Sequence, residues 1–236
     1  MKRFYVNVVA WLLLLEVLLF AFVEVIGNIN GFAPGVDRPL DQFLPAVAAN
    51  HLGLVLVYMA YILSGVVLIP LALLFPRLLP DSETPLLRLG ATFGVISATL
   101  RVLSVSRYLF FVPLLADTYV SGNAATHSAV VFAYQANDAF AGAGLGEYLG
   151  DGLFLCLWLG MLAIAFLQAK TLPAWIGWLG GLVALLVATV LVGNFFPQTS
   201  LLTPLGLAAT LVWFLVLAVV LFIVSARAPR QVFASH

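Results

Sequence analysis

Charged residues are scarce in this sequence: Asp, Glu, Lys and Arg make up 8% of its 236 residues, whereas 64% are hydrophobic. A soluble domain carries about a quarter charged residues, so this composition argues against a soluble globular protein and indicates a membrane protein. Acidic and basic residues balance at ten each. This balance leaves no overall electrostatic basis for binding nucleic acid.

Cysteine and metal-binding motifs are also nearly absent. Cys156 is the single cysteine, so the chain forms no internal disulfide, and a small buried side chain is the simplest role for this residue. No His-x-x-x-His, His-Glu-x-x-His or Cys-x-x-Cys spacing occurs, so no metal or other cofactor is expected. One alternative stays open, a metal site at the outer rim formed by His51, His127 and Asp138.

What the sequence has instead is long apolar runs. A bilayer core of about 30 Å needs about 20 apolar residues per helix, and helices satisfy their own backbone hydrogen bonds in lipid. Six runs are long enough, so we expect an all-α integral membrane protein, a single transmembrane domain built as a six-helix bundle. The six spans are expected at residues 4–27, 52–75, 86–116, 144–169, 173–196 and 202–225.

Positively charged residues predict the orientation, because cytoplasmic loops are enriched in Lys and Arg. If the N-terminus is cytoplasmic, seven of these residues lie near cytoplasmic span ends and only Arg38 lies outside. We therefore expect both termini in the cytoplasm and a multi-pass protein of the inner (plasma) membrane. The seven inner residues are Lys2, Arg3, Arg77, Arg88, Lys170, Arg227 and Arg230.

Two polar segments are expected outside the membrane. Residues 28–50 are polar and contain several Pro and Gly, which predicts an ordered cap or a short helix. Residues 126–140 (THSAVVFAYQANDAF) have helical character but are too polar to span. We expect this second segment to form an amphipathic helix between spans three and four, on the outer surface or in the mouth of the bundle.

The third span carries two arginines, Arg101 and Arg107. A charged residue at membrane depth costs about 2.5–3.5 kcal/mol on insertion scales, so it is kept only with a partner or a purpose. A helix rises about 1.5 Å per residue, which places Arg101 at the depth of Glu16 or Asp151. The same count places Arg107 at the depth of Glu24 or Glu147.

These charged residues predict a polar ligand-binding pocket that opens to the outer side. Ser104 and Tyr108 share the arginine face of the third span, and Glu147 and Asp151 lie four residues apart on one face of the fourth. Four carboxylates face two arginines, so at least one carboxylate at depth is expected to lack a cation and could carry protons, unless Glu24 and Glu147 lie high enough to be hydrated. The alternative is that the ion pairs only lock the helices together. The candidate pocket residues are Glu16, Glu24, Arg101, Ser104, Arg107, Tyr108, Glu147, Asp151 and Asn194.

Glycines recur at four-residue spacing in several spans, as in Gly142, Gly146 and Gly150. Small residues at this spacing let membrane helices approach closely, so we expect these glycines to serve packing.

Three stretches resemble a bacterial family of six-span membrane proteins classed as a domain of unknown function. The third span carries Arg107 and Tyr108 followed by Pro113, the fourth opens with Gly146-Glu147-Tyr148-Leu149-Gly150, and the fifth opens with the motif at residues 172–180 (LPAWIGWLG). Ile176 stands where that family usually has leucine, and the first two spans carry no matching motif. The resemblance implies the six-span fold and adds weight to Arg107 and Glu147, but it implies no activity.

Three functions remain open from the sequence. The leading hypothesis is the binding or transport of a small polar, anionic or amphiphilic solute, with the arginines holding an anionic group. The alternatives are a non-catalytic subunit or regulator of a larger membrane complex and a membrane-embedded enzyme. The expected partners are the lipid bilayer and a small-molecule or lipid-like ligand, and a homo-oligomer or a membrane-protein partner stays open.

Overall fold

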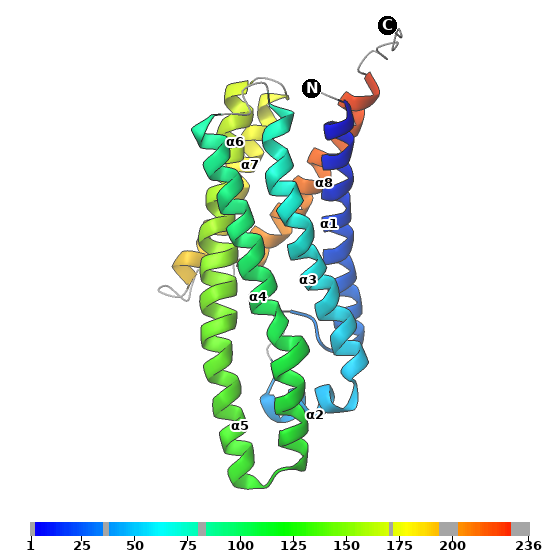
Figure 1. The fold of residues 1–236 in the computed structure, drawn as a ribbon, viewed down its shortest axis with the longest axis vertical. Coiled ribbons are helices and arrows are strands. Elements are labelled where there is room, and N and C mark those ends of the chain that lie inside the picture. Colours follow the sequence, from blue (N-terminus) through cyan, green and yellow to red (C-terminus); the bar gives the residue numbers. More distant parts are fainter. Residues whose placement is uncertain (1–2, 35–37, 80–83, 170–171, 194–202, 228–236) are drawn as a thin grey trace, which may run out of the picture.

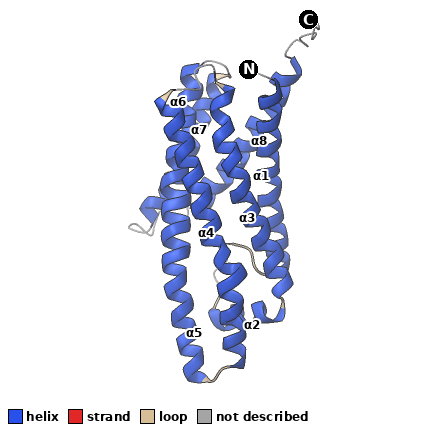
Figure 2. Cartoon of the chain, in the orientation of Figure 1, coloured by secondary structure: helices blue, strands red, loops and turns tan. Residues whose placement is uncertain are grey.

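The computed structural model describes residues 3–34, 38–79, 84–169, 172–193 and 203–227. In these ranges the chain forms a bundle of long helices with no strand (Figure 2). Six of the helices are long and apolar enough to cross a membrane. The prediction of an all-helical, six-span membrane protein is therefore confirmed.

The first half of the bundle is formed by three long helices. They are α1 (Arg3–Asn30), α3 (His51–Leu74), which continues as the 3₁₀ turn η1 (Phe75–Leu78), and α4 (Pro85–Ser121). The second half contains a continuous helix from Ala124 to Ala169, made of α5 (Ala124–Asn137), η2 (Asp138–Phe154) and α6 (Leu155–Ala169). It is completed by α7 (Ala174–Gly193) and α8 (Thr203–Arg227).

Local sequence signals set the ends of these helices. Gly31 follows α1 with a φ of 76°, a left-handed conformation that favours glycine. The N–H of Phe32 then donates to the carbonyl of Gly27 at 2.7 Å, which closes the helix end in the manner of a Schellman motif. Asn50 caps the start of α3, where its side chain accepts from the N–H of Gly53 at 2.9 Å.

The loop between α1 and α3 contains the expected short helix. This helix, α2 (Leu40–Ala49), buries Phe43, Leu44 and Val47. Its apolar side packs in a core with α3 and α4 residues such as Val57 and Val112. The segment is thus folded onto the bundle.

The fourth spanning helix starts earlier than the sequence predicts. Residues 126–140 are helical, but they continue directly into the spanning helix instead of forming a separate surface helix. Asn123 caps this helix by accepting from the N–H of Thr126 at 3.0 Å, and no proline interrupts the chain before Ala169. The helix therefore has a start signal and no stop signal over its 46 residues.

The α4–α5 hairpin projects beyond the other helices at one end of the molecule (Figure 1). With 37 residues, α4 is about 55 Å long at 1.5 Å per residue, much longer than a bilayer core of about 30 Å. We call this the hairpin end. The start of α1 and the end of α8 lie together at the opposite end, the terminal end (Figure 1).

Two apolar cores follow one another along the bundle. The core toward the terminal end contains the buried aromatics Phe75, Trp158 and Trp213, and Trp213 donates through Nε1 to the carbonyl of Ile176 at 3.1 Å, which joins α8 to α7. The core toward the hairpin end contains Phe43 and Tyr58. The polar residues of the third span lie near the junction of these two cores.

Candidate functional site

The element that organises the site is η2, a 17-residue π-helix. Hydrogen bonds from i to i+5 give such a helix roughly 4.4 residues per turn, or about 82° per residue. Asp138 and Asp151 are thirteen residues apart, so they point within about 20° of each other in a π-helix. In an α-helix at about 100° per residue they would point about 140° apart. The wide coil therefore places both carboxylates on the face that meets α4.

Glycines on this face allow the close approach. A Cβ at Gly142 would lie 2.6 Å from Cζ of Arg107, and a Cβ at Gly146 would lie 2.8 Å from Cβ of Ser104. Such distances are far below van der Waals contact. The glycines thus serve helix packing, as their spacing predicts. The side chains that pack against them are the polar side chains of α4.

Arg101 forms the centre of a buried ion cluster with Glu16 and Asp151. Its Nη2 and Nε lie 2.8 and 3.2 Å from Oδ1 of Asp151, and its Nη1 lies 3.2 Å from Oε1 of Glu16. Ser64 donates to the same Glu16 oxygen at 2.9 Å and accepts from Nη1 of Arg101 at 3.2 Å. The side chain of Arg101 is 4% exposed. Arg101 therefore contacts both of the partners that depth counting predicts, Glu16 and Asp151.

Arg107 lies six residues, or about 1.7 turns, farther along α4 toward the hairpin end. Its Nη2 lies 2.7 Å from Oδ1 of Asp138 and donates to the hydroxyl of Tyr108 at 3.1 Å. Depth counting predicts Glu24 or Glu147 as the ion-pair partner, and the structure has Asp138 instead. The reason is η2, whose wide coil turns Asp138 onto the α4 face.

A cavity of about 90 Å³ lies between the two arginines. We call it the arginine cavity. Because Glu147 is exposed and also lines it, the cavity reaches the molecular surface. Tyr58 stacks on Tyr108 with ring centroids 3.8 Å apart and forms part of the wall. The polar lining consists of Tyr58, Tyr61, Arg101, Ser104, Arg107, Tyr108, Glu147 and Asp151.

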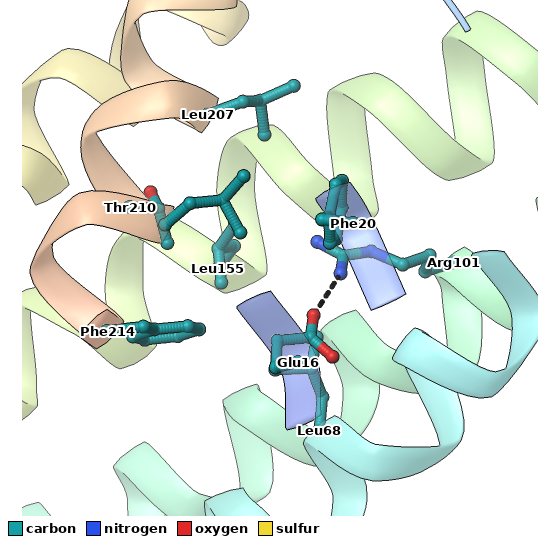
Figure 3. Close-up of a pocket in the computed structure, with 9 residues that line it drawn as sticks. Glu16, Phe20, Leu68, Arg101, Leu155, Leu207, Thr210 and Phe214 are labelled. Carbon is teal, nitrogen blue, oxygen red and sulfur yellow. Dashed lines mark hydrogen bonds and ion pairs between the residues drawn. The ribbon is translucent and has the colours of Figure 1, made fainter. Parts of the chain in front are cut away.

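Six of the nine predicted pocket residues line this cavity, two do not, and one lies outside the described residues. Glu16 lies behind Arg101, where it lines a much smaller cavity (Figure 3). Glu24 is exposed on α1 and is not part of the lining. Asn194 lies outside the described residues.

The three candidate metal ligands are not brought together. His51 lies 3.3 Å from Asp117, His127 stacks on Tyr119 with centroids 4.2 Å apart, and Asp138 pairs with Arg107. Within the described ranges no three His, Cys, Asp or Glu side chains form a group that could hold a metal ion. The geometry gives no support to a metal centre at the rim.

Sequence reasoning misses three polar residues, all on α3: Tyr58, Tyr61 and Ser64. They sit in an almost continuous apolar run, so no charge draws attention to them. A signal exists, however. They are spaced three residues apart, which places them along one side of a helix.

Six membrane-crossing helices around a buried ion cluster define a multi-pass α-helical membrane protein. The chain belongs to the family described as a domain of unknown function (DUF4386), whose model matches residues 8–224. The sequence resemblance to an uncharacterised membrane family is thereby confirmed. No curated protein and no solved structure matches the chain.

Proposed function

We propose that this protein binds a small polar solute in the arginine cavity, as a transporter or a solute-responsive membrane protein. The observation that carries the proposal is the polar lining of a cavity set within apolar, membrane-crossing helices. Ionisable side chains are rare at such depth and mark solute or ion pathways in membrane proteins. Convergent polar groups in a surface-connected cavity are also what a binding site requires.

The charges of the lining favour a solute that carries both signs of charge. Each arginine already has an acidic partner, Asp151 for Arg101 and Asp138 for Arg107. A purely anionic solute would have to compete with these carboxylates. A small zwitterion can place its anionic group near the guanidinium groups of the lining and its cationic group near the carboxylates, so it leaves the charge balance of the site unchanged, and the tyrosine hydroxyls supply further hydrogen bonds.

The site is expected to face the outside of the inner (plasma) membrane, with both termini cytoplasmic. Two observations support this orientation: the seven-to-one distribution of Lys and Arg, and the position of the α1 start and the α8 end at the same end (Figure 1). Alkaline phosphatase inserted at Gly122 in the hairpin turn should be active. Fused after residue 227, it should be inactive, whereas a green fluorescent protein fused there should fluoresce. The reverse pattern would overturn the orientation.

Binding can be tested with three probes of similar size: glycine, acetate and methylammonium. Glycine should raise the thermal unfolding midpoint of the purified protein in a saturable way, because a ligand that binds only the folded state stabilises it. Arg107→Ala should weaken the apparent affinity for glycine, obtained from this titration, at least tenfold. Arg77→Ala, in η1 at the terminal end of the second span, is the matched control and should leave it unchanged.

The other outcomes of this experiment are also decisive. A saturable shift with acetate alone would show that the solute is anionic and not zwitterionic, and the proposed binding function would remain. Three flat titrations, or equal shifts in wild type and Arg107→Ala, would remove the arginine cavity as the binding site.

A second candidate function is that of a subunit in a larger membrane complex. The observation in its favour is that both helices of the projecting hairpin expose an aromatic side chain, Phe110 at 75% and Phe132 at 73%. Exposed apolar side chains outside the bilayer are available to a partner. A partner that co-purifies with wild type and is lost in Phe132→Ser, together with flat solute titrations, would favour this function.

A further inference from the structure

We propose that Glu16 is a proton-binding site, and that its carboxyl group carries a proton in the structure described above. Glu16 is not part of the arginine cavity but lies on the other side of Arg101 (Figure 3). The inference therefore goes beyond solute binding, and its test requires no solute.

The hydrogen bonds of Glu16 are those of a carboxylic acid. Its Oε1 accepts from Ser64 at 2.9 Å and from Arg101 at 3.2 Å. Its Oε2 is buried and has no hydrogen-bond partner. A carboxylate would spread its charge over both oxygens and leave half of it without a donor, at a high cost of desolvation. A protonated carboxyl group has a carbonyl oxygen that fits Oε1 and a hydroxyl that fits Oε2.

Apart from Ser64 and Arg101, the surroundings of Glu16 are almost entirely apolar. Its side chain is 1% exposed, and it borders a cavity of about 10 Å³ whose other lining residues, besides Arg101, are Phe20, Leu68, Leu155, Leu207, Thr210, Leu211 and Phe214. A space of this size holds about one water molecule. Thr210 is the polar neighbour from α8, and its hydroxyl already donates to the carbonyl of Gly206 at 2.9 Å.

The charge balance around Arg101 also indicates that Glu16 is protonated. Among the described residues, the titratable groups near Glu16 on the packed elements are Arg101 of α4, Asp151 of η2 and Tyr61 of α3, whose ring lies 6.0 Å from the guanidinium. One cation thus serves two carboxyl groups. Asp151 has the closer contacts, at 2.8 and 3.2 Å to a single oxygen, and it also lines the arginine cavity. The ionised partner is therefore Asp151, and Glu16 is the neutral one.

The route for the proton runs past Arg101. Arg101 borders both the small cavity at Glu16 and the arginine cavity, which reaches the surface. When its side chain swings aside, the Glu16 hydroxyl gives its proton to a water molecule, leaving a carboxylate and a hydronium ion. Uptake is the reverse step, so no other reactant is required.

Infrared spectroscopy of the protein purified in dodecyl maltoside, a detergent without carbonyl groups, tests the proposal directly. At neutral pH, wild type should show the carbonyl stretch of a protonated carboxylic acid, with a small downshift in D₂O. Glu16→Gln should lose this band. Asp138→Asn, the matched variant on the acidic partner of Arg107, should keep it. Ser64→Ala should move the band to higher frequency, because it removes a donor to the carbonyl oxygen.

The result is decisive even if one variant folds poorly. If Asp138→Asn does not fold, the Ser64→Ala shift and the loss in Glu16→Gln still assign the band. No such band in wild type, or a band that persists in folded Glu16→Gln, would overturn the proposal. A band that Ser64→Ala leaves unmoved would belong to another carboxyl group and overturn it as well.

Discussion

Arg101→Met is expected to lower the free energy of unfolding in detergent by about 3–5 kcal/mol, the range found when one partner of a buried ion pair is removed. The substitution keeps an unbranched apolar side chain but leaves the carboxylate of Asp151 without its cation at membrane depth. Unfolding by SDS titration, followed through the tryptophan fluorescence of the five indoles, measures the change.

Further variants show whether the loss of stability comes from the unpaired charge or from the changed shape of the side chain. Arg101→Met with Asp151→Asn should recover most of the loss, because the orphaned charge is removed along with its partner. Arg101→Met with Glu16→Gln should recover little if Glu16 is already neutral. Arg107→Met is the milder control, since its partner Asp138 has a side chain that is 48% exposed. Equal losses for the two arginines would contradict the central role of Arg101.

Gly146→Ala is expected to lower stability by about 1–3 kcal/mol through overpacking. The added Cβ would lie 2.8 Å from Cβ of Ser104 and closer still to its hydroxyl oxygen. Ser104 is buried, so it has little room to yield. Because α4 would be pushed away from η2, the arginine cavity should change shape, and solute binding should weaken together with stability.

The expected change in stability has the opposite sign at a glycine with free space beside it. At Gly160 an added Cβ would lie 3.9 Å from Cβ of Ala184, an ordinary contact, so Gly160→Ala should be neutral or stabilising by up to about 1 kcal/mol from helix propensity. Combining Gly146→Ala with Ser104→Gly should restore packing, because the side chain removed from α4 makes room for the Cβ added to η2. A Gly146→Ala protein as stable as wild type would show that α4 and η2 are less tightly packed than described.

The sequence predicts the parts of this protein that depend on composition and depth. Long apolar runs predict the six spans, because the bilayer thickness fixes the length a helix needs. Depth counting brings Arg101 to the level of Glu16 and Asp151, and the contacts follow because a buried cation requires acidic partners. The short helix α2 and the packing role of Gly146 are predicted on similarly local grounds.

The parts that the sequence does not predict depend on how η2 winds. A face assignment at 3.6 residues per turn cannot place Asp138 beside Arg107 while Asp151 meets Arg101, and a π-helix in place of an α-helix has no clear sequence signature. Residues 126–140 join the fourth span because no stop signal separates them from it, and their polarity gives no sign of this. Ser64 is missed because hydroxyl groups are common in membrane helices and carry no charge to be balanced.

The winding of η2 also fixes the number of residues that can separate Asp138 from Asp151. One residue more or fewer would swing Asp138 by roughly a quarter of a turn relative to Asp151, at about 82° per residue, so only one acid could still face its guanidinium. Outward-facing positions of this stretch can vary in chemistry, but its residue count cannot. Insertions and deletions are therefore excluded here, although the nearby hairpin tip can accept them.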